Sequence, residues 1–349
     1  MKAYTSNNIR NIAVLGHGGK GKTTLCEAML YIAGASDRLG RVADGNTVLD
    51  FDSEEKRRKS SVSSAIAALE WDNTKLNIID APGLFDFEGG AAEAVRAAEA
   101  VLIVTSAGSG VDVGTEKAFR AAEKKGAAKF FAVTKTDSDH RNFYKTFDAL
   151  KEVYGNKLCP TIIPYMEGNI TKCYVNLMTG MAFSYDENGK ATKVPVPEDS
   201  VIEEMTSAFM EAVATTDDAL MEKFFEGEKF TKEEILKGLC IGIFDGSIYP
   251  VYAVSGLTCA GVDQLLYGLA WSAPGAFGYA GEKCTYENGE EGILPCDENG
   301  PLAAVCFKTI ADPFVGKMSF FKVVSGKLAP DTAASTPLAR SRCASRPRT

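Results

Sequence analysis

The sequence predicts an α/β fold in which helices cover both faces of a mostly parallel sheet. Through residues 11–153, short apolar runs alternate with segments of helical periodicity, and this alternation is typical of a parallel sheet. A glycine-rich loop joins the first apolar run to the first helical segment. With 349 residues, 45% of them hydrophobic, the chain is long enough for two domains of ordinary size.

The predicted elements follow one another in a regular order. Residues 11–15 are expected to form a buried strand, and apolar residues then recur at helical spacing from Leu25 until Gly34 ends the pattern. Residues 63–71 and 75–80 are predicted to pair as a hairpin at a sheet edge. The next helices are expected at residues 91–100, 115–125 and 143–153, and the strands between them at residues 101–105 and 129–134.

The alternation is interrupted at about residues 158–235, which we interpret as an inserted subdomain with a small β-rich part followed by helices. A strand at 248–255 and a helix at 262–271 restore the pattern. The run SAPGAFGYAG then predicts a domain boundary. The expected organisation is a first domain at residues 1–277, a linker at 278–298, an incomplete β-domain at 299–330 and a disordered tail at 331–349.

Charge and cysteine content exclude several classes of protein. The net charge of −8 argues against binding nucleic acid through bulk positive charge, so no sequence-specific nucleic-acid partner is expected. The nine cysteines form no CxxC pair and only two histidines accompany them, which makes a zinc site improbable. No apolar run is long enough to span a membrane and the N-terminus has no apolar signal core, so we expect a cytoplasmic protein that binds no membrane.

The glycine-rich loop matches the phosphate-binding pattern GxxxxGKT. Its glycines allow backbone N–H groups to surround a polyphosphate at a helix N-terminus, whereas a plain glycine-rich turn is the simpler alternative. Lys22 is expected to contact the β- and γ-phosphates, and the Thr23 hydroxyl to bind Mg²⁺. The residues predicted to bind nucleotide here are Gly16, His17, Gly18, Gly19, Lys20, Gly21, Lys22, Thr23 and Thr24.

Three further loops follow apolar strands. In the run LNIIDAPG, Asp80 is expected to hold Mg²⁺, and Ala81, Pro82 and Gly83 continue the site, with the Gly83 N–H placed to meet a γ-phosphate. The run TKTD resembles the NKxD element that recognises guanine, with Asp137 accepting from the base and Lys135 packing on it. Thr134 replaces the asparagine. Ser255, Gly256 and Leu257 follow the last strand, where a guanine-contacting loop is expected.

Together these four elements resemble the GTP-binding domain of translational GTPases, most closely the elongation factor G type. The resemblance implies a P-loop GTPase fold, binding of GTP or GDP with Mg²⁺, and the ribosome as partner of a monomeric protein. It places the magnesium-binding threonine of the first switch segment at Ser61, matches residues 158–235 to an extra subdomain, and identifies residues 301–328 as the start of a β-barrel domain. It extends to about residue 330.

The sequence departs from that family at its catalytic positions. Lys22, Gly83 and Leu84 are the expected catalytic positions, and Leu84 stands where the family has the histidine that orients the attacking water. Leucine can neither donate nor accept a hydrogen bond, so a slow intrinsic GTPase is predicted. Gly19 replaces an aspartate of the phosphate loop, and Ser61 keeps the hydroxyl of threonine. The combination indicates a diverged paralogue of elongation factor G.

The chain leaves the family pattern about thirty residues into the second domain. This suggests C-terminal truncation before the domains that mimic a tRNA, with a frameshift as its hypothetical origin. Two alternatives to a GTPase follow. The first is a guanine-nucleotide switch that does not turn over, or an inert fragment of such a factor. The second is a P-loop ATPase, which Asp137 disfavours.

Overall fold

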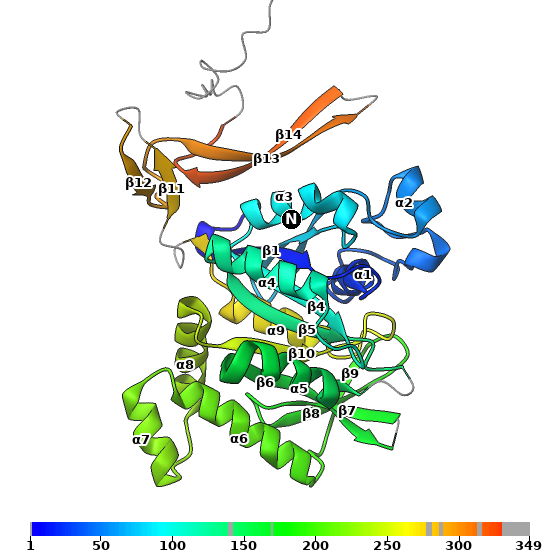
Figure 1. Cartoon of the computed structure of the whole chain (residues 1–349), viewed down its shortest axis with the longest axis vertical. Helices are drawn as coiled ribbons and strands as arrows, with labels where there is room; N and C mark the ends of the chain where they lie inside the picture. Colours follow the sequence, from blue (N-terminus) through cyan, green and yellow to red (C-terminus); the bar gives the residue numbers. More distant parts are fainter. Residues whose placement is uncertain are drawn as a thin grey trace, which may run out of the picture. The chain divides into compact units, whose positions relative to one another are not determined.

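The computed structural model describes residues 2–138, 142–168, 170–276, 281–285, 289–312 and 316–329. Internal contacts divide the chain into two units, residues 1–278 and residues 279–349. Figure 1 shows the helices and strands of each unit along the chain.

The first unit is built on a ten-stranded sheet with the order β2-β3-β1-β4-β5-β10-β6-β7-β8-β9. The six strands from β3 to β6 in that order are mutually parallel, whereas β2 and β7 to β9 are antiparallel to their neighbours. The strands are β1 (Ile9–Leu15), β2 (Ala65–Trp71), β3 (Thr74–Asp80), β4 (Ala100–Ser106), β5 (Ala128–Thr134), β6 (Leu158–Glu167), β7 (Ile170–Asn176), β8 (Met181–Tyr185), β9 (Ala191–Val194) and β10 (Tyr249–Ala253). The predicted mostly parallel α/β fold is confirmed.

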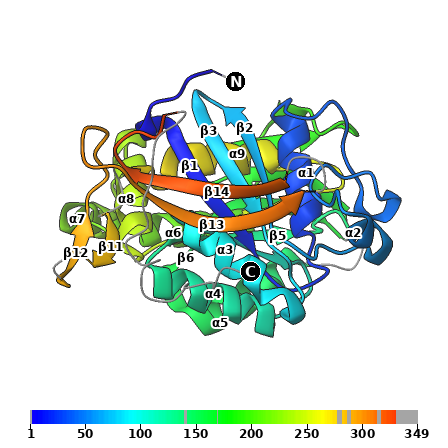
Figure 2. The same cartoon turned by 90° about the horizontal axis from the view of Figure 1, so that it is seen from above.

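Helices cover both faces of this sheet. Contacts place α1, α8 and α9 on one face and α3, α4 and α5 on the other, while α6 packs against β6 (Figure 2). The α-helices of the described residues are α1 (Lys22–Ile32), α2 (Ser53–Arg58), α3 (Glu88–Ala97), α4 (Val113–Lys125), α5 (Phe143–Tyr154), α6 (Ser200–Ala214), α7 (Asp218–Glu226), α8 (Lys232–Asp245) and α9 (Val262–Ser272).

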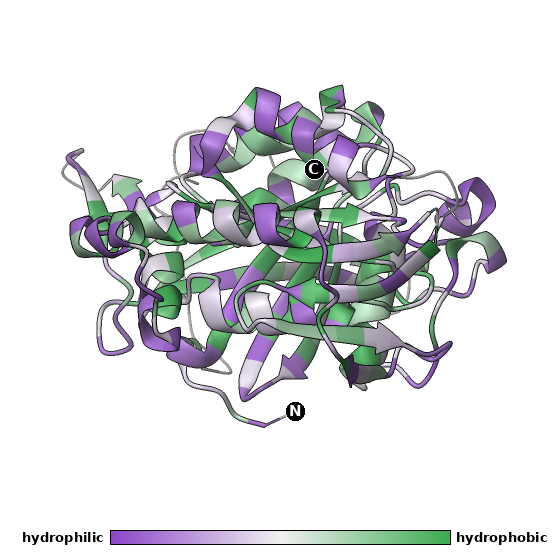
Figure 3. Ribbon diagram, turned by 90° about the horizontal axis from the view of Figure 1, so that it is seen from below, coloured by the Kyte–Doolittle hydropathy of each residue, from purple (hydrophilic) through white to green (hydrophobic). Residues whose placement is uncertain are grey.

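The core lies where the central strands are buried from both sides. Every residue of β4 and of β5 is buried, as expected for parallel strands between two helical layers. Figure 3 shows hydrophobic residues concentrated on the central strands and hydrophilic residues on the outer helices. Phe130 and Phe131 of β5 are fully buried on successive positions, so they fill opposite faces of the sheet.

The predicted edge hairpin is confirmed as β2 and β3. Trp71 pairs with Thr74, which leaves Asp72 and Asn73 as a two-residue turn. Both turn residues have positive φ angles, 43° and 57°, the conformation that such tight hairpin turns require and that Asp and Asn tolerate.

The strands of residues 158–194 continue the central sheet. β6 lies parallel beside β10, and β7, β8 and β9 extend the sheet from it as antiparallel neighbours. The helical part that follows is divided: α6 ends at Ala214, and the Asp217 side chain accepts from the Ala219 N–H to begin α7.

The second unit contains two antiparallel strand pairs within its described residues. They are β11 (Glu282–Thr285) with β12 (Glu291–Leu294), and β13 (Ala303–Asp312) with β14 (Gly316–Ser325). These antiparallel strands are consistent with the start of a barrel domain, as predicted. The first pair falls in the segment expected to be a linker. The predicted disordered tail, 331–349, and residues 278–280 and 286–288 of the predicted linker lie outside the described residues.

Phe209 provides a test of the core beneath α6. Its side chain is fully buried, so Phe209→Ala is expected to lower the free energy of unfolding by about 3–5 kcal/mol through lost burial and a residual cavity. Phe225 of α7 is 80% exposed, and Phe225→Ala is the matched control with an expected change below about 0.5 kcal/mol. Urea unfolding followed by circular dichroism measures both. Equal effects of the two variants would contradict the packing described here.

Candidate functional site

The loop between β1 and α1 adopts a conformation that only glycine allows at its start. Gly16 has a φ of 141°, and a Cβ atom there would lie 2.2 Å from the backbone oxygen of Val104 in β4. Gly21 has a φ of 89° and caps the N-terminus of α1. The loop therefore runs tightly over the end of β4 and directly into the helix, which is the geometry of a phosphate-binding loop.

Side chains hold three backbone carbonyls of this loop. Lys22 Nζ donates to the His17 carbonyl at 2.9 Å and Lys135 Nζ donates to the Gly19 carbonyl at 2.7 Å. Thr134 Oγ1 donates to the Lys20 carbonyl at 2.6 Å. These bonds fix the conformation of the loop. Because the carbonyl groups point toward these side chains, the backbone N–H groups of the loop can point toward an anion.

Two hydroxyls and two carboxylates converge beside the start of α1. Thr23 Oγ1 donates to Asp80 Oδ2 at 2.6 Å, and Ser61 Oγ donates to Asp50 Oδ1 at 2.7 Å. The two hydroxyl oxygens lie 3.1 Å apart. Since each hydroxyl donates its hydrogen to a carboxylate, the lone pairs of both oxygens are left to bind a cation.

The chemistry of this donor set fits a hard divalent cation such as Mg²⁺. Asp80 Oδ1 and Asp50 Oδ2 are buried without a hydrogen-bond partner, so each carboxylate has an oxygen to offer. No group of three or more His, Cys, Asp or Glu side chains in the described part of the chain is placed to hold a metal ion. An ion at this position therefore needs hydroxyl, water or phosphate oxygens as additional ligands.

Burial controls the charges in this cluster. Asp80 is 1% exposed, and the loss of hydration raises its pKa to about 7, although the Thr23 hydrogen bond and the Lys22 charge oppose the rise. Burial also lowers the pKa of Lys22, against the attraction of Asp80. Both groups are thus poised to gain from a charged ligand that supplies the missing interactions.

Asp50 is a residue of this cluster that the sequence analysis missed. It lies in the segment before α2, eleven positions before Ser61, and its side chain is buried. Its sequence signal was weak: a single acidic residue directly after the apolar pair Val48–Leu49. Asp50 joins the cluster only because the chain turns back after α2 and places Ser61 beside it.

Gly83 lies against the phosphate-binding loop, and its predicted contact with a γ-phosphate stays a prediction. A Cβ atom at Gly83 would lie 2.1 Å from Lys22 Nζ and 2.8 Å from the Gly18 nitrogen. The next residue, Leu84, is 41% exposed, and its Cδ2 atom lies 3.1 Å from the position that a Cβ atom at Gly18 would occupy. An aliphatic side chain therefore covers the loop at the position that the resemblance assigns to a polar one.

His17 and Lys20 turn toward the loop before α4. Lys20 Nζ donates to Ser109 Oγ at 2.8 Å and lies 3.1 Å from Asp112 Oδ2, while His17 Nδ1 lies 3.9 Å from Asp112 Oδ1. The His17 ring also contacts Phe85 edge-on, with 5.5 Å between ring centroids. These contacts hold the loop to its surroundings, so the Lys20 charge is already partnered.

The run TKTD connects the phosphate-binding loop to the loop after β10. Thr134 Oγ1 lies 3.0 Å from the Thr105 carbonyl, in addition to its bond with Lys20. Thr136 Oγ1 donates to the Val254 carbonyl at 3.0 Å and lies 2.7 Å from the Tyr174 hydroxyl. Asp137 follows directly and is exposed. Thr134 and Lys135 thus contact the phosphate-binding loop, whereas Asp137 is exposed to solvent.

The loop after β10 packs against the start of α1. Ser255 is fully buried, and its Oγ accepts from the Thr258 N–H at 3.2 Å. A Cβ atom at Gly256 would lie 3.0 Å from the backbone of Thr24, and Leu257 is 51% exposed. Ala81 and Pro82 are buried between the Asp80 and Gly83 contacts. The structure therefore brings all four sequence elements to one edge of the sheet.

The chain is similar to known proteins over most of its length. Residues 7–274 match the family described as Elongation factor Tu GTP binding domain. The chain is 33% identical over 328 residues to proteins described as Elongation factor G-like protein from two Mycobacterium tuberculosis strains, CDC 1551 / Oshkosh and H37Rv. The match covers 93% of this chain and 45% of each relative, so the chain spans about half of their length.

A solved structure shares the fold. A crystal structure of a protein from Thermus thermophilus superposes with a TM-score of 0.81 at 33% sequence identity. The superposition covers 93% of this chain and 46% of that one.

The bonds made by Thr134 can be tested by an isosteric change. Thr134→Val removes the hydroxyl that holds the Lys20 carbonyl, so we expect the free energy of unfolding to fall by about 1–2 kcal/mol. Thr105 is the matched control because its buried hydroxyl has no partner, and Thr105→Val is expected to be neutral or stabilising. Urea unfolding measures both variants. A larger loss for Thr105→Val than for Thr134→Val would contradict these hydrogen bonds.

Proposed function

The chain belongs to the translational GTPase family, and on that premise we propose that it binds GTP and GDP with Mg²⁺ and hydrolyses GTP to GDP and phosphate. The observation that carries this proposal is the Thr23 hydroxyl, which bonds to Asp80 and lies beside Ser61 at the start of α1. This contact supports the proposal that the phosphates, the cation and the switch segment meet at the start of α1.

The residues from Gly16 to Thr24 hold the phosphates. Lys22 places its charge at the β- and γ-phosphates, exchanging the His17 carbonyl for phosphate oxygens. Thr23 and Ser61 would hold Mg²⁺ through their hydroxyls, with Asp80 and Asp50 beside them. The ion supplies neutralisation of the charge on the phosphates.

Asp137, Lys135 and the loop at Ser255–Leu257 select guanine. The Asp137 carboxylate accepts two hydrogen bonds from guanine, from the ring N–H and from the exocyclic amine, and adenine offers no such pair of donors. The Lys135 stem packs on the base, and Thr134 takes over the anchoring of the phosphate loop. The proposal of guanine specificity rests on the Asp137 carboxylate being free to face a ligand.

Hydrolysis proceeds by in-line attack of water on the γ-phosphate, with the Gly83 N–H directed at that phosphate. Leu84 cannot orient the water, because its side chain has no polar atom. The intrinsic rate is therefore slow. The positions proposed to act in catalysis are Lys22 and Gly83, with Leu84 at the position of the family histidine.

We further propose that the segments 50–63 and 83–90 change conformation between the GTP and GDP states, because they carry Ser61 and Gly83. The resemblance to elongation factor G supports the ribosome as partner and the cytoplasm as location. None of the described helices is long and apolar enough to cross a lipid bilayer. A monomeric, diverged paralogue of elongation factor G fits these features.

A non-hydrolysing guanine-nucleotide switch is the second candidate. It is favoured by one observation: the Leu84 side chain packs onto the phosphate-binding loop at Gly18, where the attacking water needs a polar neighbour. The two candidates share the nucleotide site and differ only in turnover.

Guanine recognition is tested by Asp137→Asn. Loss of the carboxylate is expected to weaken GDP binding by about a hundredfold. Xanthosine diphosphate should gain affinity, because the asparagine amide can donate to the 2-oxo group. Titration calorimetry with both nucleotides measures the change, and Asp148→Asn on the exposed face of α5 is the matched control. Unaltered GDP affinity in Asp137→Asn would refute the guanine site.

Turnover is tested by Leu84→His. A histidine at this position should accelerate single-turnover GTP hydrolysis by about tenfold or more, because it can hold the attacking water. Val153→His adds the same side chain on the exposed face of α5, outside the proposed site, and should leave the rate unchanged. Rates are measured with and without ribosomes. If Leu84→His is no faster in either case, Leu84 does not occupy the water-orienting position.

A further inference from the structure

One face of α1 carries two polar side chains one helical turn apart. Thr23, at the start of the helix, is proposed above to hold a cation, and Glu27 follows it four residues later. Side chains at this spacing lie on the same side of a helix. Glu27 is fully buried, and a buried carboxylate costs free energy unless its oxygens are hydrogen-bonded. No contact with phosphate or base has been assigned to Glu27, so its burial needs its own explanation.

Glu27 bonds to the backbone of the segment that precedes α2. Its Oε1 atom accepts from the N–H groups of Val48 and Leu49 at 2.8 and 2.9 Å. Its other oxygen, Oε2, is buried without a hydrogen-bond partner and lies against Gly40, where a Cβ atom would be 2.1 Å away. Burial raises the pKa of Glu27, whereas the two backbone bonds favour its charged form. The carboxylate of Glu27 therefore ties two consecutive amides of this segment to α1.

The two bonded amides lead directly to the cation cluster. Asp50 follows Leu49 in the chain, and its Oδ1 atom accepts from the Ser61 hydroxyl at 2.7 Å. The Ser61 oxygen lies 3.1 Å from Thr23 Oγ1. These contacts close a ring that starts and ends on α1, in the order Thr23, Glu27, Leu49, Asp50 and Ser61. Because the ring is closed, a shift of Leu49 moves Asp50 and, through it, the Ser61 hydroxyl.

The carboxylates near this ring also repel one another. Burial is the main cause that raises the pKa of Asp80, and the negative charges of Asp50 and Glu27 raise it further. Glu27 therefore has two routes to a cation beside Thr23, through its charge and through the position that it gives to Asp50. A glutamine separates the two routes, because its amide oxygen can accept the same two hydrogen bonds without carrying the charge.

We propose that Glu27 is a positioning residue for the cation, because its two backbone bonds set the place of Asp50 and Ser61. This inference rests on the proposed function, since it assumes that Mg²⁺ binds with the nucleotide at Thr23. The effect is geometric: hydrogen bonds to two successive amides restrict the side chain that follows them, whereas a charge acts at any orientation. Glu27 therefore contributes to the affinity for Mg²⁺ and not to the affinity for the nucleotide alone.

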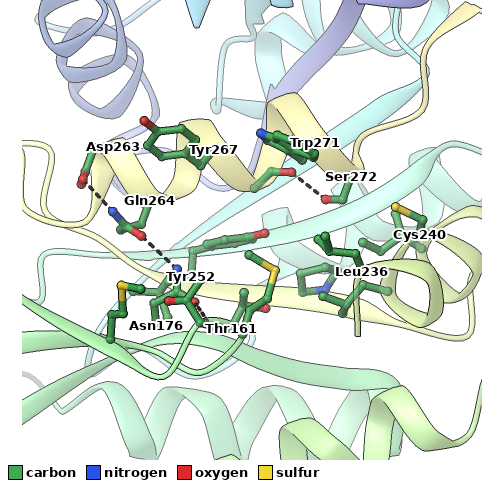
Figure 4. Close-up of a pocket in the computed structure, with 18 of the residues that line it drawn as sticks. Thr161, Asn176, Leu236, Cys240, Tyr252, Asp263, Gln264, Tyr267, Trp271 and Ser272 are labelled. Atoms are coloured by element: carbon green, nitrogen blue, oxygen red, sulfur yellow. Dashed lines mark hydrogen bonds between the residues drawn. The ribbon is translucent and has the colours of Figure 1, made fainter. Parts of the chain in front are cut away.

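A hydrogen-bonded pair on the wall of a separate cavity supplies the control. The cavity, of about 720 Å³, lies between the sheet and the helices α8 and α9, and none of the residues proposed to bind nucleotide or cation lines it. Asn176 Nδ2 donates to Gln264 Oε1 at 2.9 Å, and both side chains are nearly fully buried (Figure 4). Asn176 Oδ1 also accepts from the Thr179 N–H. Asn176→Leu thus removes two buried hydrogen bonds, as Glu27→Leu does, at a distance from the ring on α1.

The test compares nucleotide binding with and without Mg²⁺. Titration calorimetry on the full chain gives the affinity for the non-hydrolysable analogue β,γ-imido-GTP in saturating Mg²⁺ and in EDTA. Glu27→Leu should reduce the increase in affinity caused by Mg²⁺ about tenfold, and should change the affinity in EDTA less than about twofold. Glu27→Gln keeps the acceptor and should retain most of the increase. Asn176→Leu should leave both affinities unchanged.

A second variant moves the carboxylate without changing it. A Cβ atom added by Gly40→Ala would lie 2.1 Å from Glu27 Oε2, so the carboxylate must shift from its place. Gly40→Ala should therefore reduce the effect of Mg²⁺ in the same direction as Glu27→Leu, and it replaces that variant if circular dichroism shows Glu27→Leu to be unfolded. Without nucleotide, hydrogen exchange at the Val48 and Leu49 amides should be faster in both variants than in the wild type.

Four results distinguish this inference from its alternatives. It is overturned if the folded Glu27 and Gly40 variants keep the wild-type response to Mg²⁺, or if their exchange at Val48 and Leu49 is unchanged. It is also overturned if Asn176→Leu loses the response equally, which would indicate general destabilisation. An equal loss in Glu27→Gln and Glu27→Leu would assign the effect to charge and overturn the positioning role. A wild-type chain that binds no nucleotide in either condition refutes the proposed function, and this inference with it.

Discussion

The close approach of Gly16 to the Val104 carbonyl is the constraint on which the candidate site depends. It brings the phosphate-binding loop onto the end of β4, and the parallel sheet brings the ends of β3, β5 and β10 to the same edge. Asp80, Thr134 and Ser255 emerge from those three ends. Parallel order thus converts positions far apart in the chain into neighbours, as is typical of ligand sites in open α/β sheets.

Two buried carboxylates shape the segment that carries Ser61. Glu27 of α1 is fully buried, and its Oε1 atom accepts from the backbone N–H groups of Val48 and Leu49 at 2.8 and 2.9 Å. Glu55 of α2 accepts from the N–H of Val62 at 3.0 Å. Burial raises the pKa of Glu27, while those backbone bonds favour its charged form. A few directional hydrogen bonds therefore fix the segment that carries Ser61. Such bonds can be exchanged, which suits a segment proposed to change conformation between nucleotide states.

In the segment 83–90, proposed above to change conformation, the side chains that contact the phosphate-binding loop are apolar or aromatic. Leu84 packs near Gly18, and Phe85 lies between the His17 ring and Lys117, whose ammonium group is 4.3 Å from the Phe85 ring centroid. Lys117 also pairs with Glu88 at the start of α3. The Leu84 and Phe85 side chains themselves offer a water molecule no donor or acceptor. Leu84 and Phe85 thus put two successive apolar side chains beside the phosphate-binding loop, which is consistent with the slow turnover proposed above.

The sequence by itself determined the parallel α/β fold, the edge hairpin and the four loops of the candidate site. Local patterns suffice for these, because a strand followed by GxxxxGKT or by TKTD carries its signal within a few residues. The sequence did not reveal β6 as a parallel strand of the central sheet. Pro160 and Pro164 weaken its strand pattern, and its parallel partner β10 follows much later in the chain. The place of Asp50 beside Ser61 and the cavity between α8 and α9 were decided by tertiary structure alone. Both require side chains from distant segments to meet, and no local pattern records such a meeting.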